Sequence, residues 1–241
     1  MNLETQEPVS TPGGQDYSVP WKFMDNWVGV VLLAIIDVVI FVIMMGQERR
    51  AELAQSSAVV LLELAYLLPV IFIFAWRRVH WRHLRFGGFK WETLGIGCGL
   101  LIGSYIIIIV HNALLFLFGV DTQGENIVEL FAKLDSPIWF FIVGAIFAPL
   151  VEEIFFRGFL FQGFRERYGW VTAMLLSAAI FAIAHLDLVV LIPTFILGCL
   201  LAYVFHRSNS IWPGIILHFL VNSFGLLGAY FVSNYPNLMP T

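Results

Sequence analysis

Charged side chains are scarce in this sequence. Only 12% of its 241 residues are Asp, Glu, Lys or Arg, whereas 59% are hydrophobic, and the mean hydropathy is +0.84. A soluble domain carries roughly 25% charged residues, so this chain has too few charges to cover a soluble surface. The composition therefore predicts an all-α integral membrane protein, a polytopic bundle with about seven spans of about 20 residues each.

Cysteines and clustered basic residues are also few. Cys98 and Cys199 both lie in apolar runs, which indicates small buried residues and not a disulfide or a metal-binding pair. No basic face is large enough for nucleic-acid binding. The first residues lack a basic segment followed by a short apolar core, so we expect no cleavable signal peptide. We interpret residues 1–26 as a disordered cytoplasmic tail.

Apolar stretches divide the rest of the chain into predicted membrane spans. We expect seven spans, at Trp27–Met45, Ala58–Ala75, Leu94–Phe118, Pro137–Gln162, Trp170–His185, Leu188–Phe205 and Ile211–Val232. The first three spans and their loops form an N-terminal part, residues 27–135. The last four form the predicted catalytic core, residues 136–232, and residues 233–241 are a tail. In the third span, Gly95, Gly99 and Gly103 predict a face that another helix can approach closely.

Basic residues are distributed unevenly between the predicted loops. With the N-terminus in the cytoplasm, most of the 13 lysines and arginines fall in cytoplasmic segments, and only Arg49, Arg50 and Lys133 fall outside. Positively charged loops tend to stay in the cytoplasm, so this bias predicts a cytoplasmic N-terminus. We expect the protein in the plasma membrane, with the basic, tryptophan-rich loop between the second and third spans at the cytoplasmic headgroups.

The fourth predicted span contains a charged motif, Glu-Glu-x-x-x-Arg. Charges at membrane depth are costly, so they are normally paired, turned inward and functional. Glu153 and Arg157 are four residues apart and can pair on one helix face, whereas Glu152 lies about 100° around the helix and is freer. Pro149 removes a backbone donor and crowds the Ala145 carbonyl, which predicts a kink or a broken turn.

Two more polar pairs occur downstream, each with helical i, i+4 spacing. Phe181 and His185 share one face of the fifth span, and His218 and Asn222 share one face of the seventh. A polar side chain in the bilayer core needs a partner or a water-filled cavity. We therefore expect Glu152 to line one wet pocket together with His185, His218 and Asn222.

These residue types suit peptide hydrolysis without a covalent nucleophile. An apolar pocket disfavours the ionised form of a glutamate, which helps Glu152 to take a proton from water and return it to a leaving amine. His185 is a candidate to orient that water, and His218 and Asn222 are candidates to donate hydrogen bonds to an oxyanion. Zinc is the competing interpretation, because Glu152, His185 and His218 together supply one oxygen and two nitrogen ligands. The usual signature of two histidines flanking a glutamate on one helix is absent.

The three blocks, in this order and at these spacings, resemble the signature of the CPBP intramembrane proteases. This family, also called Abi, comprises CAAX proteases and bacteriocin-processing proteins and includes the type II CAAX prenyl endopeptidases. The resemblance covers residues 136–226. It implies a helical membrane protease whose site faces the cytoplasmic leaflet, and a membrane-associated peptide or protein as substrate, lipidated or not.

The resemblance also implies roles for the individual residues. It implies that Glu152 is the catalytic base and that His185 is its partner. His218 and Asn222 would orient water or stabilise the oxyanion, with Glu153 and Arg157 in support. Members have been described both as metalloproteases and as metal-free glutamate proteases. We expect no cofactor, with zinc held by Glu152, His185 and His218 as the alternative.

Two other functions fit the same sequence. The first is a non-catalytic membrane protein of the same fold, acting in bacteriocin immunity or as a scaffold. The second is a small transporter in which the mid-span acids Asp37 and Glu63 carry protons. No motif includes these two acids, and a structural role is the simpler interpretation of both.

Overall fold

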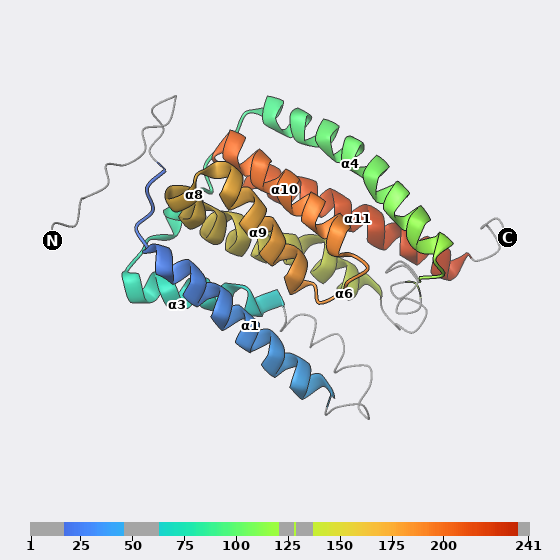
Figure 1. The fold of residues 1–241 in the computed structure, drawn as a ribbon, viewed down its shortest axis with the longest axis horizontal. Coiled ribbons are helices and arrows are strands. Elements are labelled where there is room, and N and C mark those ends of the chain that lie inside the picture. The colour runs from blue at the N-terminus through green and yellow to red at the C-terminus, as the bar shows by residue number, and fades with distance from the viewer. Residues whose placement is uncertain (1–16, 46–62, 121–127, 129–136, 236–241) are drawn as a thin grey trace.

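The computed structural model describes residues 17–45, 63–120, 128 and 137–235, and every regular element in these ranges is a helix (Figure 1). The N-terminal elements are α1 (Phe23–Met45), α3 (Leu67–Arg77), the 3₁₀ helix η1 (Trp81–Leu84) and α4 (Trp91–Leu117). The C-terminal elements are α6 (Pro137–Phe141), η2 (Ile142–Phe147), α7 (Ala148–Glu153), η3 (Ile154–Phe161), α8 (Gln162–Tyr168), α9 (Trp170–Ala184), α10 (Leu191–Ser208) and α11 (Trp212–Asn234).

The predicted helical membrane bundle is confirmed. Within the described ranges, five helices are long and apolar enough to cross a membrane: Phe23–Ile40, Trp91–Leu117, Ile138–Tyr168, Leu191–Ser208 and Trp212–Asn234. The apolar helix α9 is shorter, with 15 residues. The predicted second span lies partly outside the described residues, and α3 is its described end.

The start of the bundle lies within the predicted tail. Helix α1 begins four residues before the predicted first span. Trp21 is only 2% exposed, and its ring centroid lies 5.4 Å from those of Phe74 and Phe159. Asp25, in the first turn of α1, pairs with Arg77 at the end of α3, with two nitrogen–oxygen distances of 2.8 Å. Apolar packing and this ion pair therefore fix the chain from before α1 onward.

The basic loop between α3 and α4 is docked on the C-terminal part. The Gln162 side chain donates to the His83 carbonyl (2.9 Å) and accepts from Arg85 Nε (3.2 Å). The Ile211 amide donates to the Arg85 carbonyl (3.1 Å). The loop thus connects the start of α8 to the turn before α11, while 45% of Trp81 stays exposed, as suits an interfacial anchor.

An unbroken helical run, residues 137–168, occupies the middle of the bundle. It contains α6, α7 and α8 and two π-helical segments, η2 and η3. Helices α1 and α3 lie on one side of it, and α4 lies on the opposite outer side, against α10 and α11 (Figure 1). The motif-bearing run is therefore enclosed by helices from both parts of the chain.

The predicted close approach to the glycine face of α4 is not seen. A Cβ atom added at Gly95, Gly99 or Gly103 would have no neighbour within 4 Å. Large apolar side chains of α4 are exposed as well, including Ile102 (70%) and Ile106 (64%). In the described part of the chain, this face of α4 has no helix against it, and such an apolar surface suits lipid.

Candidate functional site

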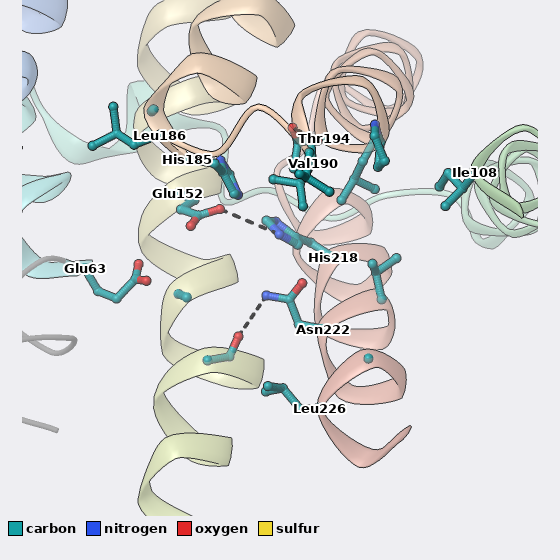
Figure 2. A pocket seen from close by; sticks show the side chains of 18 of the residues that line it. Glu63, Ile108, Glu152, His185, Leu186, Val190, Thr194, His218, Asn222 and Leu226 are labelled. Carbon is teal, nitrogen blue, oxygen red and sulfur yellow. Dashed lines mark hydrogen bonds and ion pairs between the residues drawn. The ribbon is translucent and has the colours of Figure 1, made fainter. Parts of the chain in front are cut away.

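A π-helical turn replaces the predicted broken turn at Pro149. The Ala148 amide donates to the Val143 carbonyl, five residues back. In this register the Gly144 carbonyl faces the nitrogen of Pro149, which carries no hydrogen. The carbonyl accepts instead from Asn222 Nδ2 on α11, at 2.8 Å (Figure 2). Asn222 therefore satisfies a backbone group that the proline leaves unpaired, and it attaches α11 to the central run.

The predicted pair of Glu153 and Arg157 is confirmed. Arg157 Nη1 lies 2.7 Å from Glu153 Oε1, and both side chains are fully buried. Arg157 Nη2 also donates to the carbonyl of Gly198 on α10 (3.1 Å), and the guanidinium lies 4.6 Å from the ring centroid of Phe181 on α9. A buried charge is tolerated when it is paired and hydrogen-bonded in this way. The pair connects three helices and neutralises Glu153.

His218 joins the two adjacent glutamates. Its Nδ1 lies 3.3 Å from Glu153 Oε1 and its Nε2 lies 3.6 Å from Glu152 Oε2 (Figure 2). Glu153 is paired with Arg157 and is therefore a carboxylate, which can only accept, so His218 Nδ1 carries the hydrogen. In a neutral ring Nε2 then presents its lone pair to Glu152. Such a contact is favourable when a proton or a water lies between the two atoms, so this pair is suited to hold a proton.

His185 caps the C-terminal end of α9 and is held from two sides. Its Nδ1 lies 2.8 Å from the Phe181 carbonyl, and because a carbonyl only accepts, Nδ1 carries the hydrogen and Nε2 is left for another partner. The Phe181 ring packs edge-on against both His185 (4.7 Å) and His218 (5.7 Å). The Phe181 ring thus positions both imidazoles.

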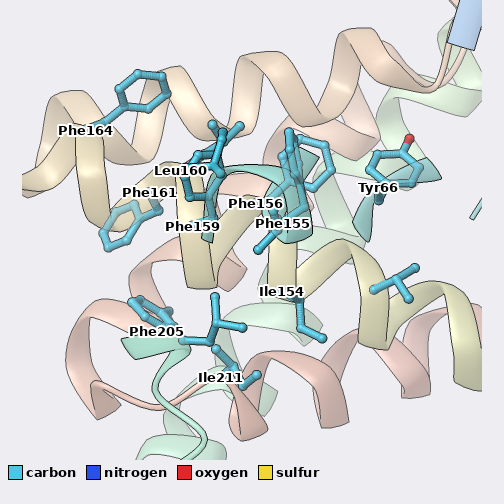
Figure 3. Close-up of a cluster of buried hydrophobic side chains, with 14 of the residues drawn as sticks. Tyr66, Ile154, Phe155, Phe156, Phe159, Leu160, Phe161, Phe164, Phe205 and Ile211 are labelled. Atoms are coloured by element: carbon cyan, nitrogen blue, oxygen red, sulfur yellow. The ribbon is translucent and has the colours of Figure 1, made fainter. Parts of the chain in front are cut away.

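Aromatic packing fixes the helical run that carries the motif. Phe155, Phe156 and Phe159 follow the two glutamates, are fully buried and contact one another through their rings (Figure 3). Tyr66, just before α3, packs on Phe155 and Phe156, and Phe156 also packs edge-on against Phe181. These rings hold the backbone of the motif between α3 and α9, so its charged side chains have little freedom to move.

One cavity of about 630 Å³ collects the predicted site residues. Glu152, His185, His218 and Asn222 all line it, as expected from their spacing (Figure 2). The volume falls in the usual range of ligand pockets. Much of the remaining wall is apolar and comes from α4 and α10, including Leu101, Ile108, Val190, Pro193 and Leu197.

Asp37 of α1 and Glu63 line the same cavity, whereas the sequence favoured a structural role for both acids. Asp37 Oδ1 and Glu63 Oε2 are buried and have no hydrogen-bond partner among the described residues. A structural role would have predicted a polar partner for each acid. The only signal in the sequence was the cost of an acid at membrane depth.

Gly214 is a second feature that the sequence did not reveal. It lies in the first turn of α11, and a Cβ atom added there would come 2.6 Å from Glu153 Oε2. Glycine at this position lets α11 approach the carboxylate closely enough for His218, one turn later, to contact it. This is a requirement for space, and no spacing rule in the sequence identifies it.

The donor types of a zinc site are present, but the described side chains do not form a metal-binding cluster. Glu152, His185 and His218 are the donor types of a catalytic zinc, and each histidine is held through Nδ1 by an oxygen, which leaves Nε2 for a metal. In the part of the chain that the structure describes, however, no three His, Cys, Asp or Glu side chains are arranged so that they could hold an ion.

The C-terminal part of the chain is similar to a known protein family. Residues 134–224 match the family described as "Type II CAAX prenyl endopeptidase Rce1-like". A Bacillus subtilis protein named "Putative membrane peptidase YdiL" is 28% identical over 138 residues, which are 55% of this chain and 57% of that protein. The "UPF0177 protein YxdF" of Lactococcus lactis is 25% identical over 178 residues, which are 72% of this chain and 98% of that protein.

The family match covers the segment that contains all three polar blocks. The chain spans little more than half the length of the Bacillus protein. No solved structure matches this chain. The resemblance to the CPBP intramembrane proteases that the three blocks predicted is confirmed, and residues 134–224 are similar to the type II CAAX prenyl endopeptidase Rce1-like family.

Proposed function

We propose that this protein is an intramembrane endopeptidase that hydrolyses a peptide bond of a membrane-associated substrate with water activated by Glu152. The family match and the peptidase name of the Bacillus relative support the reaction class. One observation carries the proposal. Glu152 is 6% exposed and lines the cavity beside His218, whereas the adjacent Glu153 is neutralised by Arg157.

The two glutamates have different roles because their surroundings differ. Glu153 has a permanent cation at 2.7 Å and serves as the fixed acceptor that orients His218. Among the residues that the structure describes, Glu152 has no cation within ion-pair distance other than the His218 ring, so it can gain or lose a proton in the cavity. Neighbouring acids held in different charge states are the usual means of separating an acid–base group from a structural one.

The proposed reaction needs only groups that line the cavity. A water donates one hydrogen to Glu152 and the other to Nε2 of His185, which leaves a lone pair free to attack the substrate carbonyl carbon. Glu152 takes the proton as the carbon–oxygen bond forms, and the second N–H of Asn222 donates to the oxyanion. The carbon–nitrogen bond then breaks, and Glu152 returns the proton to the leaving amine.

The proposed role of His218 changes from the one the sequence suggested. Its Nε2 is an acceptor in the neutral ring, so it cannot donate to an oxyanion until it is protonated. We propose that His218 stabilises the proton held by Glu152, because His218 Nε2 lies 3.6 Å from Glu152 Oε2. Oxyanion stabilisation falls to Asn222, and Glu153 and Arg157 act as positioning residues.

We further propose that the site lies in the cytoplasmic half of the plasma membrane, with the N-terminus inside. Gln162, ten residues after Glu152, is bonded to the basic loop at His83, and Ile211, seven residues before His218, is bonded to the same loop. At 1.5 Å per helical residue, both site residues lie about 10–15 Å from that loop. Basic loops favour the cytoplasm, which supports this orientation.

The test is cleavage of quenched-fluorescent membrane peptides, some of them prenylated, by purified protein in detergent. Glu152→Gln is compared with wild type and with Glu92→Gln, an exposed acid in the first turn of α4. We expect Glu152→Gln to lose at least 100-fold in kcat with its fold intact, in line with the usual worth of a general base, and Glu92→Gln to be unchanged.

The same assay decides the cofactor. We propose that none is needed, so a strong chelator should leave the wild-type rate unchanged. Loss of activity with chelator, restored by zinc, would instead make Glu152, His185 and His218 metal ligands. Folded wild-type protein that cleaves no peptide would contradict the protease proposal and favour bacteriocin immunity or a scaffold.

A further inference from the structure

Three acids gather in the cavity, and two of them have no place in the proposed reaction. Asp37 from α1 and Glu63 near the start of α3 line the same cavity as Glu152. Tyr66, which also lines the cavity, lies within electrostatic range of all three acids. In Figure 2 the Glu63 side chain extends toward the helical run that carries Glu152. The N-terminal part of the chain thus contributes two acidic side chains, Asp37 and Glu63, to the wall of the cavity.

Within the described ranges, no lysine or arginine compensates the acids of the cavity. No Lys or Arg occurs among the described residues that line it, and Arg157 is already paired with Glu153. Glu63 interacts electrostatically with both Asp37 and Glu152. Carboxyl groups brought together in an apolar site either repel one another or stay protonated unless a cation approaches.

Unsatisfied atoms point to a ligand in the same place. Glu152 is more than nine-tenths buried, and its Oε2 has no hydrogen-bond partner among the described residues, since His218 Nε2 lies 3.6 Å away. Asp37 Oδ1 and Glu63 Oε2 are buried atoms that also lack a hydrogen-bond partner among the described residues. Buried polar atoms are normally bonded, so three acceptors around one cavity predict a donor that enters it. Tyr66 and Tyr105, also in the wall, add aromatic faces that favour a cation.

We propose that Asp37 and Glu63 bind a cationic side chain of the substrate, and that the peptides cleaved carry a lysine or arginine close to the scissile bond. This inference rests on the proposed function, because it assigns the substrate class of the same site. A basic side chain that enters the cavity meets Asp37 of α1 and Glu63, which precedes α3, and removes their repulsion. Its backbone would then lie beside Glu152, and the two acids determine specificity without taking part in the chemistry.

The first test measures binding without cleavage. Glu152→Gln protein in zwitterionic lipid nanodiscs is titrated with fluorescent membrane peptides that carry lysine, norleucine or glutamate at one position. Norleucine matches the lysine stem without its charge. We expect the lysine peptide to bind at least about 10-fold more tightly than the norleucine peptide, which equals about 1.4 kcal/mol. Adding Asp37→Asn and Glu63→Gln should abolish the difference, and adding Glu92→Gln should preserve it.

The second test measures cleavage by protein with Glu152 intact. The Asp37→Asn/Glu63→Gln variant should lose at least about 10-fold in kcat/KM for the lysine peptide, through KM, and keep its rate on the norleucine peptide. Its thermal midpoint in detergent reports whether it is folded, and single Asp37→Asn and Glu63→Gln variants replace it if it is not.

The outcomes separate the two proposals. Equal binding of lysine and norleucine peptides, or a preference that survives neutralisation of both acids, would overturn cation recognition even if the enzyme is active. Lysine-selective binding by a protein that cleaves no peptide would support cation recognition by Asp37 and Glu63 and contradict the protease proposal. A proton leak into vesicles that requires Asp37 and Glu63, without lysine selectivity, would replace both with the transporter function.

Discussion

The buried pair of Glu153 and Arg157 provides a quantitative test of how the site is built. Replacing Arg157 with methionine keeps most of the side-chain volume but leaves the Glu153 carboxylate buried without a counter-charge. Removing one partner of a buried ion pair typically costs about 3–5 kcal/mol of folding free energy. This arginine also donates to the Gly198 carbonyl at 3.1 Å and lies over Phe181, so we expect the upper part of that range.

The double variant is expected to recover most of the loss. Glu153→Gln in the Arg157→Met background removes the buried charge, and replacing a buried pair by uncharged groups of similar volume is often nearly neutral. We therefore expect a coupling free energy of at least about 2 kcal/mol in the double-mutant cycle. Activity should not recover with stability, because His218 would then lack the carboxylate that orients it.

The assay is reversible unfolding of the four proteins in mixed micelles, followed by tryptophan fluorescence. The matched control is Arg77→Met, because Arg77 pairs with Asp25 at the same short distance but a quarter of its side chain is exposed. An exposed pair stabilises the fold much less than a buried one, because solvent screens its charges. If Arg157→Met cost no more than Arg77→Met, the reasoning that Arg157 neutralises a buried carboxylate would be refuted.

Two further substitutions test the close contacts of α11. Gly214→Ala places a methyl group 2.6 Å from Glu153 Oε2, so we expect a loss of about 1–3 kcal/mol in stability and a reduced kcat, whereas Gly228→Ala on the same helix, with nothing within 4 Å, should change neither. Asn222→Ala leaves the Gly144 carbonyl unpaired, so thermal unfolding should show a loss of about 1–3 kcal/mol, with kcat at least about 10-fold lower. Unchanged stability in Asn222→Ala would contradict the assigned role of the amide.

Much of the site was predictable because its signals are local. The four-residue spacing of Glu153 and Arg157 and of His218 and Asn222 fixes a common helix face without knowledge of the fold. Polar groups in apolar helices have few alternatives to facing one another, so convergence of His185 with them followed from the cost of leaving each alone in lipid.

The unpredicted features depend on distances between helices. Whether Asp37 and Glu63 reach the cavity depends on how α1 and α3 pack on the central run, and no spacing within either helix reports that. The need for glycine at 214 arises from a side chain 61 residues earlier in the chain. The sequence shows that Pro149 lacks a backbone donor, but it does not show the π-helical register before this residue. The donor that replaces the missing one, Asn222 Nδ2, is on another helix.

The unequal lengths of neighbouring helices bear on how water reaches a site inside a membrane. The apolar part of the central run, Ile138–Tyr168, has 31 residues and is about 45 Å long at 1.5 Å per residue, which exceeds the hydrocarbon thickness of about 30 Å, so it tilts or projects from the bilayer. Helix α9, with 15 residues, is only about 22 Å long. Lipids beside a short helix thin to match it. His185 ends that short helix, so thinning of the bilayer beside α9 would shorten the path of water to the site.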